Sequence, residues 1–208
     1  MSTFKTFIHK YKDCWLLLFA AFYLAGFFFV ENITVTEYHI ISSVLDDYIP
    51  FCEYFVIPYF LWFPYMLVPV IYFYIHNRRD YNKLAIMGAL GMTLFLIISL
   101  IYPNTLIIRP ETFARDNIFT ACVSFLHSID TCTNVFPSIH VYNSLVVHMV
   151  IIKSENLKGK LAIHITSWIL CISIILSTVF LKQHSVIDVF GAFALYAILY
   201  PFIQKCKA

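Results

Sequence analysis

The sequence predicts an all-α integral membrane protein, a bundle of six transmembrane helices. Of its 208 residues, 61% are hydrophobic and only 12% are charged, whereas soluble proteins carry about 25% charged residues. A helix needs roughly 20 mostly apolar residues to cross the hydrocarbon core, where lipid offers no partner to an unpaired backbone group. Six stretches satisfy this requirement: Cys14 to Val30, Tyr54 to Ile75, Leu84 to Tyr102, Pro137 to Ile152, Leu161 to Leu181 and Val186 to Ile203.

The six stretches differ in detail. The first follows three lysines, as the core of a signal peptide does, but it has no clear small-residue cleavage site, so we expect a retained anchor. The second contains three prolines, which predict a kink. The fourth is short, so we expect it to begin below the membrane surface. No linker or run of like charge interrupts the chain, which predicts a single domain over residues 1–208.

The distribution of charge predicts the orientation, because Lys and Arg concentrate in cytoplasmic loops. Both termini are predicted to be cytoplasmic, since 11 of the 14 basic residues then fall on that side: Lys5, Lys10, Lys12, Arg78, Arg79, Lys83, Lys153, Lys158, Lys160, Lys205 and Lys207. Only Arg109, Arg115 and Lys182 lie on the outer side, together with nine of the twelve acids. A net charge of +2 in scattered groups does not favour a nucleic acid partner.

The segments between the spans contain two further amphipathic stretches. Ile33 to Tyr48 places apolar residues at helical spacing, which predicts a helix along the outer interface. The loop from Pro103 to Phe136 contains a second stretch near Asn117 to Leu126, and a polar loop of this length is more often functional than idle. The six cysteines have no metal-ligand spacing and are interpreted as packing residues; a disulfide between Cys122 and Cys132 is the alternative.

Three polar clusters occur at predicted helix ends on the outer side: Arg109-Pro110, then Pro137-Ser138-Ile139-His140, then His184-Ser185-Val186-Ile187-Asp188. His184 and Asp188 are four residues apart, so they share one face if the sixth helix begins at His184 or before it. A carboxylate in this position fixes the tautomer of the imidazole and leaves the far nitrogen free to attack an electrophile. The pair is therefore a candidate nucleophile with its orienting acid.

The other two clusters predict an anion site beside this nucleophile. Pro137 suits the first turn of a helix, where free backbone amides and the Ser138 hydroxyl can bind phosphate oxygens. His140 lies in the same turn and, when protonated, can give its proton to a departing alkoxide. Arg109 carries a planar group that matches two phosphate oxygens. The tetrad P-S-x-H has a chance expectation of roughly 0.02 in a chain of this composition, so it is more specific than H-x-x-x-D.

These residues resemble the type 2 phosphatidic acid phosphatase superfamily, the lipid phosphate phosphatases, whose signatures run K-x6-R-P, P-S-x-H and S-R-x5-H-x3-D in this order. The resemblance covers Tyr102 to Asp188 and implies a six-helix bundle without metal or other cofactor. It implies His184 as the nucleophile of a phosphohistidine, Asp188 as its partner, His140 as general acid, and Arg109 with Ser138 as phosphate ligands. The implied partner is a lipid phosphate in a multi-pass membrane protein, with the cell membrane as the expected location.

Two positions depart from the signatures. Tyr102 stands where the family has lysine, and Thr178, beside a retained Ser177, stands where it has arginine. Lys182 or Arg115 can supply the missing positive charge. Fewer cations suit a diester with one charge better than a monoester with nearly two, and in this respect the chain resembles the branch of inositol phosphorylceramide and sphingomyelin synthases.

Three functions follow as hypotheses. The leading one is a lipid phosphatase, the second a lipid phosphotransferase that uses an alcohol or a second lipid as acceptor, and the third a transporter or lipid-binding scaffold without turnover. The six other histidines are predicted to be structural. The loop residues Asp130, Thr131, Thr133 and Asn134 are expected to shape the approach to Pro137 or to contact a head group. The residues make no prediction about the oligomeric state.

Overall fold

A computed structural model describes residues 15–205 of the chain, with side chains through residue 201. In this part of the chain the protein has eight α-helices, which confirms the all-α class. Four helices are long and apolar enough to cross a membrane: Trp15–Asn32, Glu53–His76, Arg78–Ile101 and Leu161–Phe180. Three shorter apolar helices accompany them: Ile118–Ile129, Ile139–Lys153 and Val186–Pro201. The chain is therefore a multi-pass helical membrane protein.

The chain divides into two compact units, residues 1–34 and residues 35–208. The first unit contains α2 (Trp15–Asn32), an apolar helix in which the Asn32 side-chain amide donates to the Phe28 carbonyl oxygen at 2.7 Å. Several residues used to predict orientation and packing lie outside the described part: Lys5, Lys10, Lys12, Cys14, Cys206 and Lys207.

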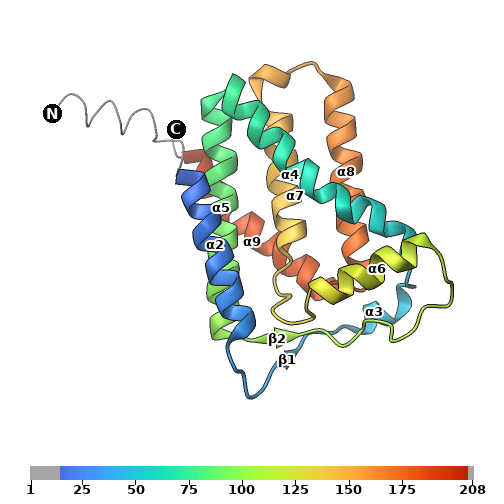
Figure 1. Cartoon of the computed structure of the whole chain (residues 1–208). Coiled ribbons are helices and arrows are strands. Elements are labelled where there is room, and N and C mark those ends of the chain that lie inside the picture. The colour runs from blue at the N-terminus through green and yellow to red at the C-terminus, as the bar shows by residue number, and fades with distance from the viewer. Residues whose placement is uncertain (1–14, 206–208) are drawn as a thin grey trace. The chain divides into compact units, whose positions relative to one another are not determined.

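The second unit is built around α7 (Ile139–Lys153). This helix packs against the other four long helices, as Figure 1 shows: α4 (Val56–His76), α5 (Arg78–Ile101), α8 (Leu161–Phe180) and α9 (Val186–Lys205). Each of the last five predicted spans therefore contains one helix. Two short 3-10 helices, η2 (Glu53–Phe55) and η3 (Glu155–Leu157), precede α4 and follow α7.

Close packing between α5 and α7 depends on a glycine. A Cβ atom on Gly91 would lie 2.0 Å from a ring carbon of Tyr142, so only glycine allows this ring to lie on α5. The Tyr142 hydroxyl donates to the Met87 carbonyl oxygen at 2.8 Å, which fixes the ring. At its start α5 is capped by Asn77, whose side-chain oxygen accepts from the Asp80 amide. The helix α4 is continuous through Pro64 and Pro69.

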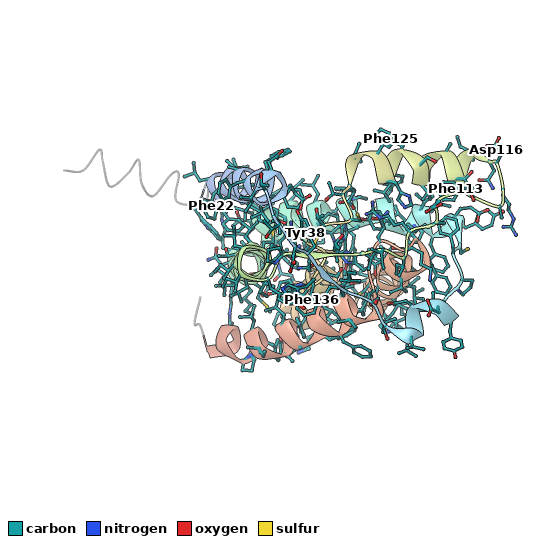
Figure 2. The ribbon with its side chains drawn as sticks, turned by 90° about the horizontal axis from the view of Figure 1, so that it is seen from below. Phe22, Tyr38, Phe113, Asp116, Phe125 and Phe136 are labelled. Carbon is teal, nitrogen blue, oxygen red and sulfur yellow. The ribbon has the colours of Figure 1, made fainter. Side chains whose placement is uncertain are left out.

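Several short elements gather at the end of the bundle where α4, α7 and α9 begin (Figure 1). Strand β1 (His39–Ile40) pairs in parallel with β2 (Asn104–Thr105), and α3 (Val44–Tyr48) follows β1. Seen from this end in Figure 2, α6 (Ile118–Ile129) lies along one edge with Phe125 pointing outward, while α3 and α9 lie toward the other.

The two amphipathic predictions had different outcomes. The second is confirmed, because Asn117 caps α6 by accepting from the amides of Phe119 and Thr120. The first is wrong for most of its length, since only Val44–Tyr48 is helical within Ile33 to Tyr48. In the non-helical part, His39–Ile40 pairs with β2 instead of forming helical hydrogen bonds.

The cysteine prediction can be checked for four positions. Cys52, Cys122, Cys132 and Cys171 are free thiols, so the alternative disulfide between Cys122 and Cys132 is wrong.

Candidate active site at the α7 and α9 helix starts

The connection between α8 and α9, here called the 181–185 turn, carries His184. The Thr178 carbonyl oxygen accepts from the amides of both Gln183 and His184, at 3.0 and 2.9 Å. Lys182 adopts the left-handed conformation with φ of 58°, which reverses the chain in a single residue. Thr178 is fully buried, and its hydroxyl donates to the Ile175 carbonyl oxygen. The residue at the signature arginine position therefore shapes the turn.

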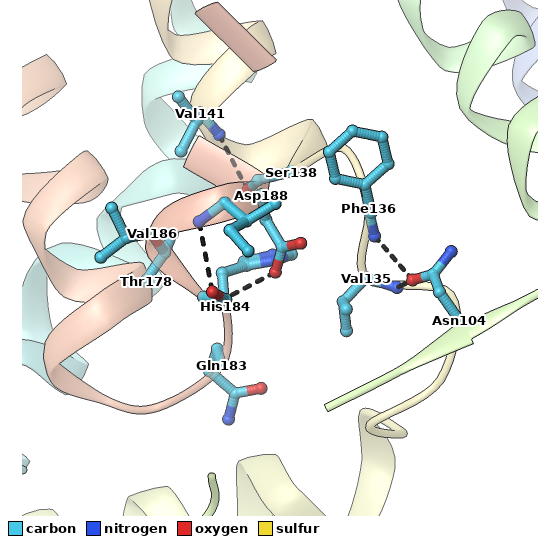
Figure 3. A network of polar contacts seen from close by, with 12 residues as sticks. Asn104, Val135, Phe136, Ser138, Val141, Thr178, Gln183, His184, Val186 and Asp188 are labelled. Atoms are coloured by element: carbon cyan, nitrogen blue, oxygen red, sulfur yellow. Dashed lines mark hydrogen bonds and ion pairs between the residues drawn. The ribbon is translucent and has the colours of Figure 1, made fainter. Parts of the chain in front are cut away.

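His184 and Asp188 are in contact, although α9 begins at Val186, so that His184 lies in the 181–185 turn before the helix and not on it. The His184 Nδ1 atom lies 3.3 Å from Asp188 Oδ2, and the same oxygen accepts from the Ser185 amide at 2.9 Å (Figure 3). Asp188 is 0% exposed and His184 is 6% exposed. With Nδ1 donating to this carboxylate, the lone pair of the neutral imidazole lies on Nε2, as nucleophilic attack requires.

The imidazole of His140 lies beside that of His184. Their ring centroids are 5.7 Å apart, although the residues belong to different helices. The other neighbours of the His140 ring are aromatic side chains of α4, Tyr59 at 4.8 Å and Trp62 at 4.5 Å between centroids. The His140 ring is therefore held between two aromatic rings of α4 and the ring of His184.

Ser138 joins the starts of α7 and α9. Its hydroxyl oxygen caps α7 by accepting from the Val141 amide at 3.4 Å, and its own amide donates to the Asp188 carbonyl oxygen at 3.2 Å (Figure 3). Ser138 is 0% exposed. The first turn of α7 is thus held directly against the residue that orients His184.

Asn104 positions the segment that leads into α7. Its side-chain oxygen accepts from the amides of Val135 and Phe136, at 2.8 and 3.0 Å (Figure 3). Phe136 in turn lies on α9, where a Cβ atom on Gly191 would come within 2.3 Å of its ring. Sequence analysis missed Asn104, because its amide partners lie more than 30 residues away along the chain.

Arg109 forms a polar link to the 181–185 turn. Its guanidinium donates to the carbonyl oxygens of Asp130 and Thr131 at 2.7 and 2.8 Å, and to the Gln183 side-chain oxygen at 2.6 Å. The Tyr59 hydroxyl donates to the Asp130 carboxylate at 3.2 Å. Because Tyr59 also contacts the His140 ring, a chain of contacts runs from Gln183, next to His184, through Arg109, Asp130 and Tyr59 to His140.

Several residues around the two histidines have buried polar atoms without a hydrogen-bond partner in the described part of the chain: Arg109 Nε, Gln183 Nε2, Trp62 Nε1, His140 Nδ1 and Asp188 Oδ1. Buried polar atoms in folded proteins are nearly always paired. Three of these atoms are fixed N–H donors of the kind that phosphate oxygens accept from.

Two predicted phosphate ligands are not brought to the histidines. The Lys182 ammonium donates to the carbonyl oxygens of Asp46 and Ile49, at 2.5 Å each. Burial lowers the pKa of Lys182, an effect that the negative charges of Asp46 and Asp47 partly oppose. Arg115 instead pairs with Glu53 at 3.2 Å, with its side chain 64% exposed. Both cations therefore bind groups other than the two histidines.

The other signature departure, Tyr102, lies at the end of α5. Its ring stacks on His39 with centroids 4.1 Å apart and planes within 6°. An aromatic pair therefore occupies the position where the family signature has a cation.

A second cluster of polar side chains lies among the long helices, away from the α9 start. The Ser167 hydroxyl lies 2.8 Å from the Tyr65 hydroxyl and 2.9 Å from His148 Nδ1, so it links α4, α7 and α8. These contacts satisfy polar groups between apolar helices, which agrees with the structural role predicted for His148. Among the described residues, no group of three or more His, Cys, Asp or Glu side chains is arranged to hold a metal ion.

The fold and the site together define a multi-pass helical membrane protein with an imidazole pair and a carboxylate at one end of its bundle. No protein-family model, no curated protein and no solved structure matches this chain.

Proposed function

We propose that the protein is a membrane lipid phosphatase that hydrolyses a lipid phosphate or pyrophosphate through a phosphohistidine. The observation that carries the proposal is the pair of imidazoles 5.7 Å apart between centroids, one of which has a buried carboxylate at its Nδ1 atom. This proposal includes membership of the type 2 phosphatidic acid phosphatase superfamily, on the strength of the three motifs in their order.

In the first chemical step, His184 Nε2 attacks phosphorus while the bond from phosphorus to the ester oxygen breaks. The proton of His140 passes to the departing oxygen, so the lipid leaves as a neutral alcohol. Asp188 stabilises the positive charge that develops on the His184 ring. An anionic phosphate between the two rings favours the protonated form of His140, because an opposite charge stabilises a cation.

In the second step a water molecule replaces the lipid alcohol. Neutral His140 takes a proton from this water, the water oxygen attacks phosphorus, and the bond from phosphorus to Nε2 breaks. Inorganic phosphate leaves, and His184 returns to its starting tautomer. The amides at the start of α7 and the unpaired N–H groups of Arg109, Gln183 and Trp62 are the proposed ligands of the phosphate oxygens.

We further propose six transmembrane spans, cytoplasmic termini and a site on the extracytoplasmic side. In support, Ser138, His140 and Asp188 lie at the starts of α7 and α9, while Arg78, Lys153 and Lys160 lie at the opposite ends of α5, α7 and α8. Labelling tests this orientation, because Cys122 and Cys132 are free thiols in the loop between α5 and α7. An impermeant maleimide should label single-cysteine variants at these positions from outside intact cells. Labelling only after lysis would place this loop in the cytoplasm and contradict the proposed orientation.

A lipid phosphotransferase is the second candidate, with the same residues and an alcohol or second lipid in place of water. It is favoured by the neutral residues at the two signature positions: Tyr102 stacks on His39, and Thr178 is committed to the 181–185 turn. Fewer cations suit a singly charged diester better than a monoester.

A screen of purified protein against lipid monoesters, pyrophosphates and diesters, with and without alcohol acceptors, separates these functions. Phosphate release in water alone supports the phosphatase, and a product formed only with an acceptor supports the transferase. Both activities should disappear in His184→Ala and persist in chelator. Lipid binding without turnover, unchanged by His184→Ala, would replace both proposals by a transporter or scaffold.

A further inference from the structure

The short helix α3 is fastened to the start of α9 through Asp46. One carboxylate oxygen, Oδ2, accepts from the Ser185 hydroxyl at 2.6 Å, and the other, Oδ1, accepts from the Val186 amide at 2.8 Å. The first amides of a helix have no partner inside the helix. Asp46, which is 2% exposed, therefore caps α9 from a position about 140 residues earlier in the chain.

A second link ties the 181–185 turn to α3. The Lys182 ammonium donates to the backbone carbonyl oxygens of Asp46 and Ile49, at 2.5 Å each. The turn is consequently held on both sides of His184, by Lys182 before it and by Ser185 after it. A left-handed lysine is unfavourable on its own, and these contacts hold Lys182 in that conformation.

The Asp46 carboxylate is itself fixed within α3. Its Oδ2 atom also accepts from the Ser43 amide at 2.7 Å, and the Ser43 side chain accepts from the Asp46 amide in return, which forms a capping box. The Ser43 hydroxyl oxygen also accepts from the Leu45 amide at 3.2 Å. Just before it, the Ile41 amide donates to the Thr105 carbonyl oxygen, which attaches the segment to β2.

We infer that Asp46 is a positioning residue for His184, an inference that rests on the proposed function of the site. Ser185 is the shared element: its amide donates to Asp188 and its hydroxyl to Asp46. The carboxylates of Asp46 and Asp188 thus bind different groups of Ser185 and fix the start of α9 together. This aligns Asp188 with the His184 ring. Misplacing a catalytic group by about 1 Å can cost on the order of 100-fold in rate.

The variant Asp46→Asn tests this role. Asparagine offers one acceptor oxygen where Asp46 uses two, so either Ser185 or Val186 loses its acceptor. We expect kcat to fall about 10- to 100-fold with KM changed by less than about threefold, because the lost alignment affects the transition state more than substrate binding. The matched control is Asp47→Asn on the same helix, where the side chain is exposed and kcat should stay unchanged.

Hydrogen exchange at Val186 separates this inference from the proposed function, because it needs no turnover. The Val186 amide should exchange at least about tenfold faster in Asp46→Asn than in Asp47→Asn. If the wild-type protein turns over no lipid phosphate, the proposed function fails, and the exchange rates still support or overturn the cap.

Two further variants distinguish positioning from loss of folding. Ser185→Ala removes the hydroxyl that donates to Asp46 and accepts from the Ile187 amide, so it should lower kcat while the protein still melts cooperatively, only about 2–4 °C below the wild type. The losses from Asp46→Asn and Asp188→Asn should be less than additive, because both act through the same turn. Wild-type kcat in Asp46→Asn, exchange at Val186 equal to that of the control, or full additivity would each overturn the inference.

Discussion

Replacing Asp188 by asparagine measures what the negative charge behind His184 contributes. This substitution removes the charge with little change in hydrogen bonding, because a single oxygen of Asp188 makes both bonds. Asp188 Oδ2 accepts from His184 Nδ1 and from the Ser185 amide, while Oδ1 has no hydrogen-bond partner in the described part of the chain. An asparagine with its oxygen at the Oδ2 position keeps both bonds. The flipped amide would set its NH2 group against the Ser185 amide and is disfavoured.

The expected loss follows from the strength of these bonds. A hydrogen bond to a charged group contributes about 1.5–3 kcal/mol and a neutral one about 0.5–1.5 kcal/mol, so removing the charge costs about 1–2 kcal/mol. At about 1.4 kcal/mol per factor of ten, kcat in Asp188→Asn should fall about 5- to 30-fold. Asp188→Ala leaves two donors without this acceptor and no longer fixes which nitrogen of the His184 ring carries the proton. Its kcat should therefore fall about 1,000-fold or more.

The assay is initial-rate phosphate release from a lipid phosphate in detergent micelles at saturating substrate. Asp47→Asn serves as the control for loss of one carboxylate at this end of the bundle. Equal losses in Asp188→Asn and Asp188→Ala would contradict the retained hydrogen bonds, and wild-type kcat in both would refute the orienting role.

Three other substitutions make separate predictions. Gly91→Ala should lower the free energy of unfolding by about 1–3 kcal/mol, because its Cβ would meet the Tyr142 ring. The control is Gly88→Ala, which has no atom within 4 Å of its Cβ and should leave the melting temperature unchanged or higher. Equal effects of the two substitutions would contradict the close packing of Tyr142 on Gly91. Burial, with the positive charge of Arg109, lowers the pKa of His127 from 6.5 to about 4. The unfolded chain therefore binds this proton at a higher pH than the folded chain, and the free energy of unfolding should fall as pH decreases from 6.5 toward 4. His127→Gln should flatten the dependence of melting temperature on pH, and an unaltered slope would show that His127 is not the group responsible for it. Arg109→Lys should lower kcat/KM about 10- to 100-fold, because an ammonium cannot replace the planar group at its three acceptors; unchanged kcat/KM would remove Arg109 from the site.

Local patterns in the sequence account for part of the site. The contact between His184 and Asp188 was predicted on the condition that the sixth helix begins at His184 or before it. The contact is present, but α9 begins at Val186, and Asp188 reaches His184 because its carboxylate folds back over the 181–185 turn and accepts from the Ser185 amide. The P-S-x-H motif likewise indicated that His140 lies in the first turn of the fourth helix, whereas the role of the Ser138 hydroxyl as the cap of α7 was not predicted. In each of these cases the decisive geometry lies within a few residues of one chain segment.

The remaining features depend on partners that are distant in the sequence. Asp46 shows the spacing of a capping box with Ser43, but nothing near it indicates a bond to Ser185. Lys182 was predicted to face phosphate because it lies close to His184, yet its left-handed backbone directs the ammonium to α3. The strand pairing of His39–Ile40 was missed because its partner comes from β2.

The cap on α9 also has a consequence for how the protein matures. Residue 46 is synthesised early and residue 186 late, so His184, the proposed nucleophile, acquires its final geometry only after these two parts of the chain have met. Under the proposed function, a copy that has inserted its helices without docking α3 would carry His140, His184 and Asp188 but react slowly, so full activity would depend on completion of the fold.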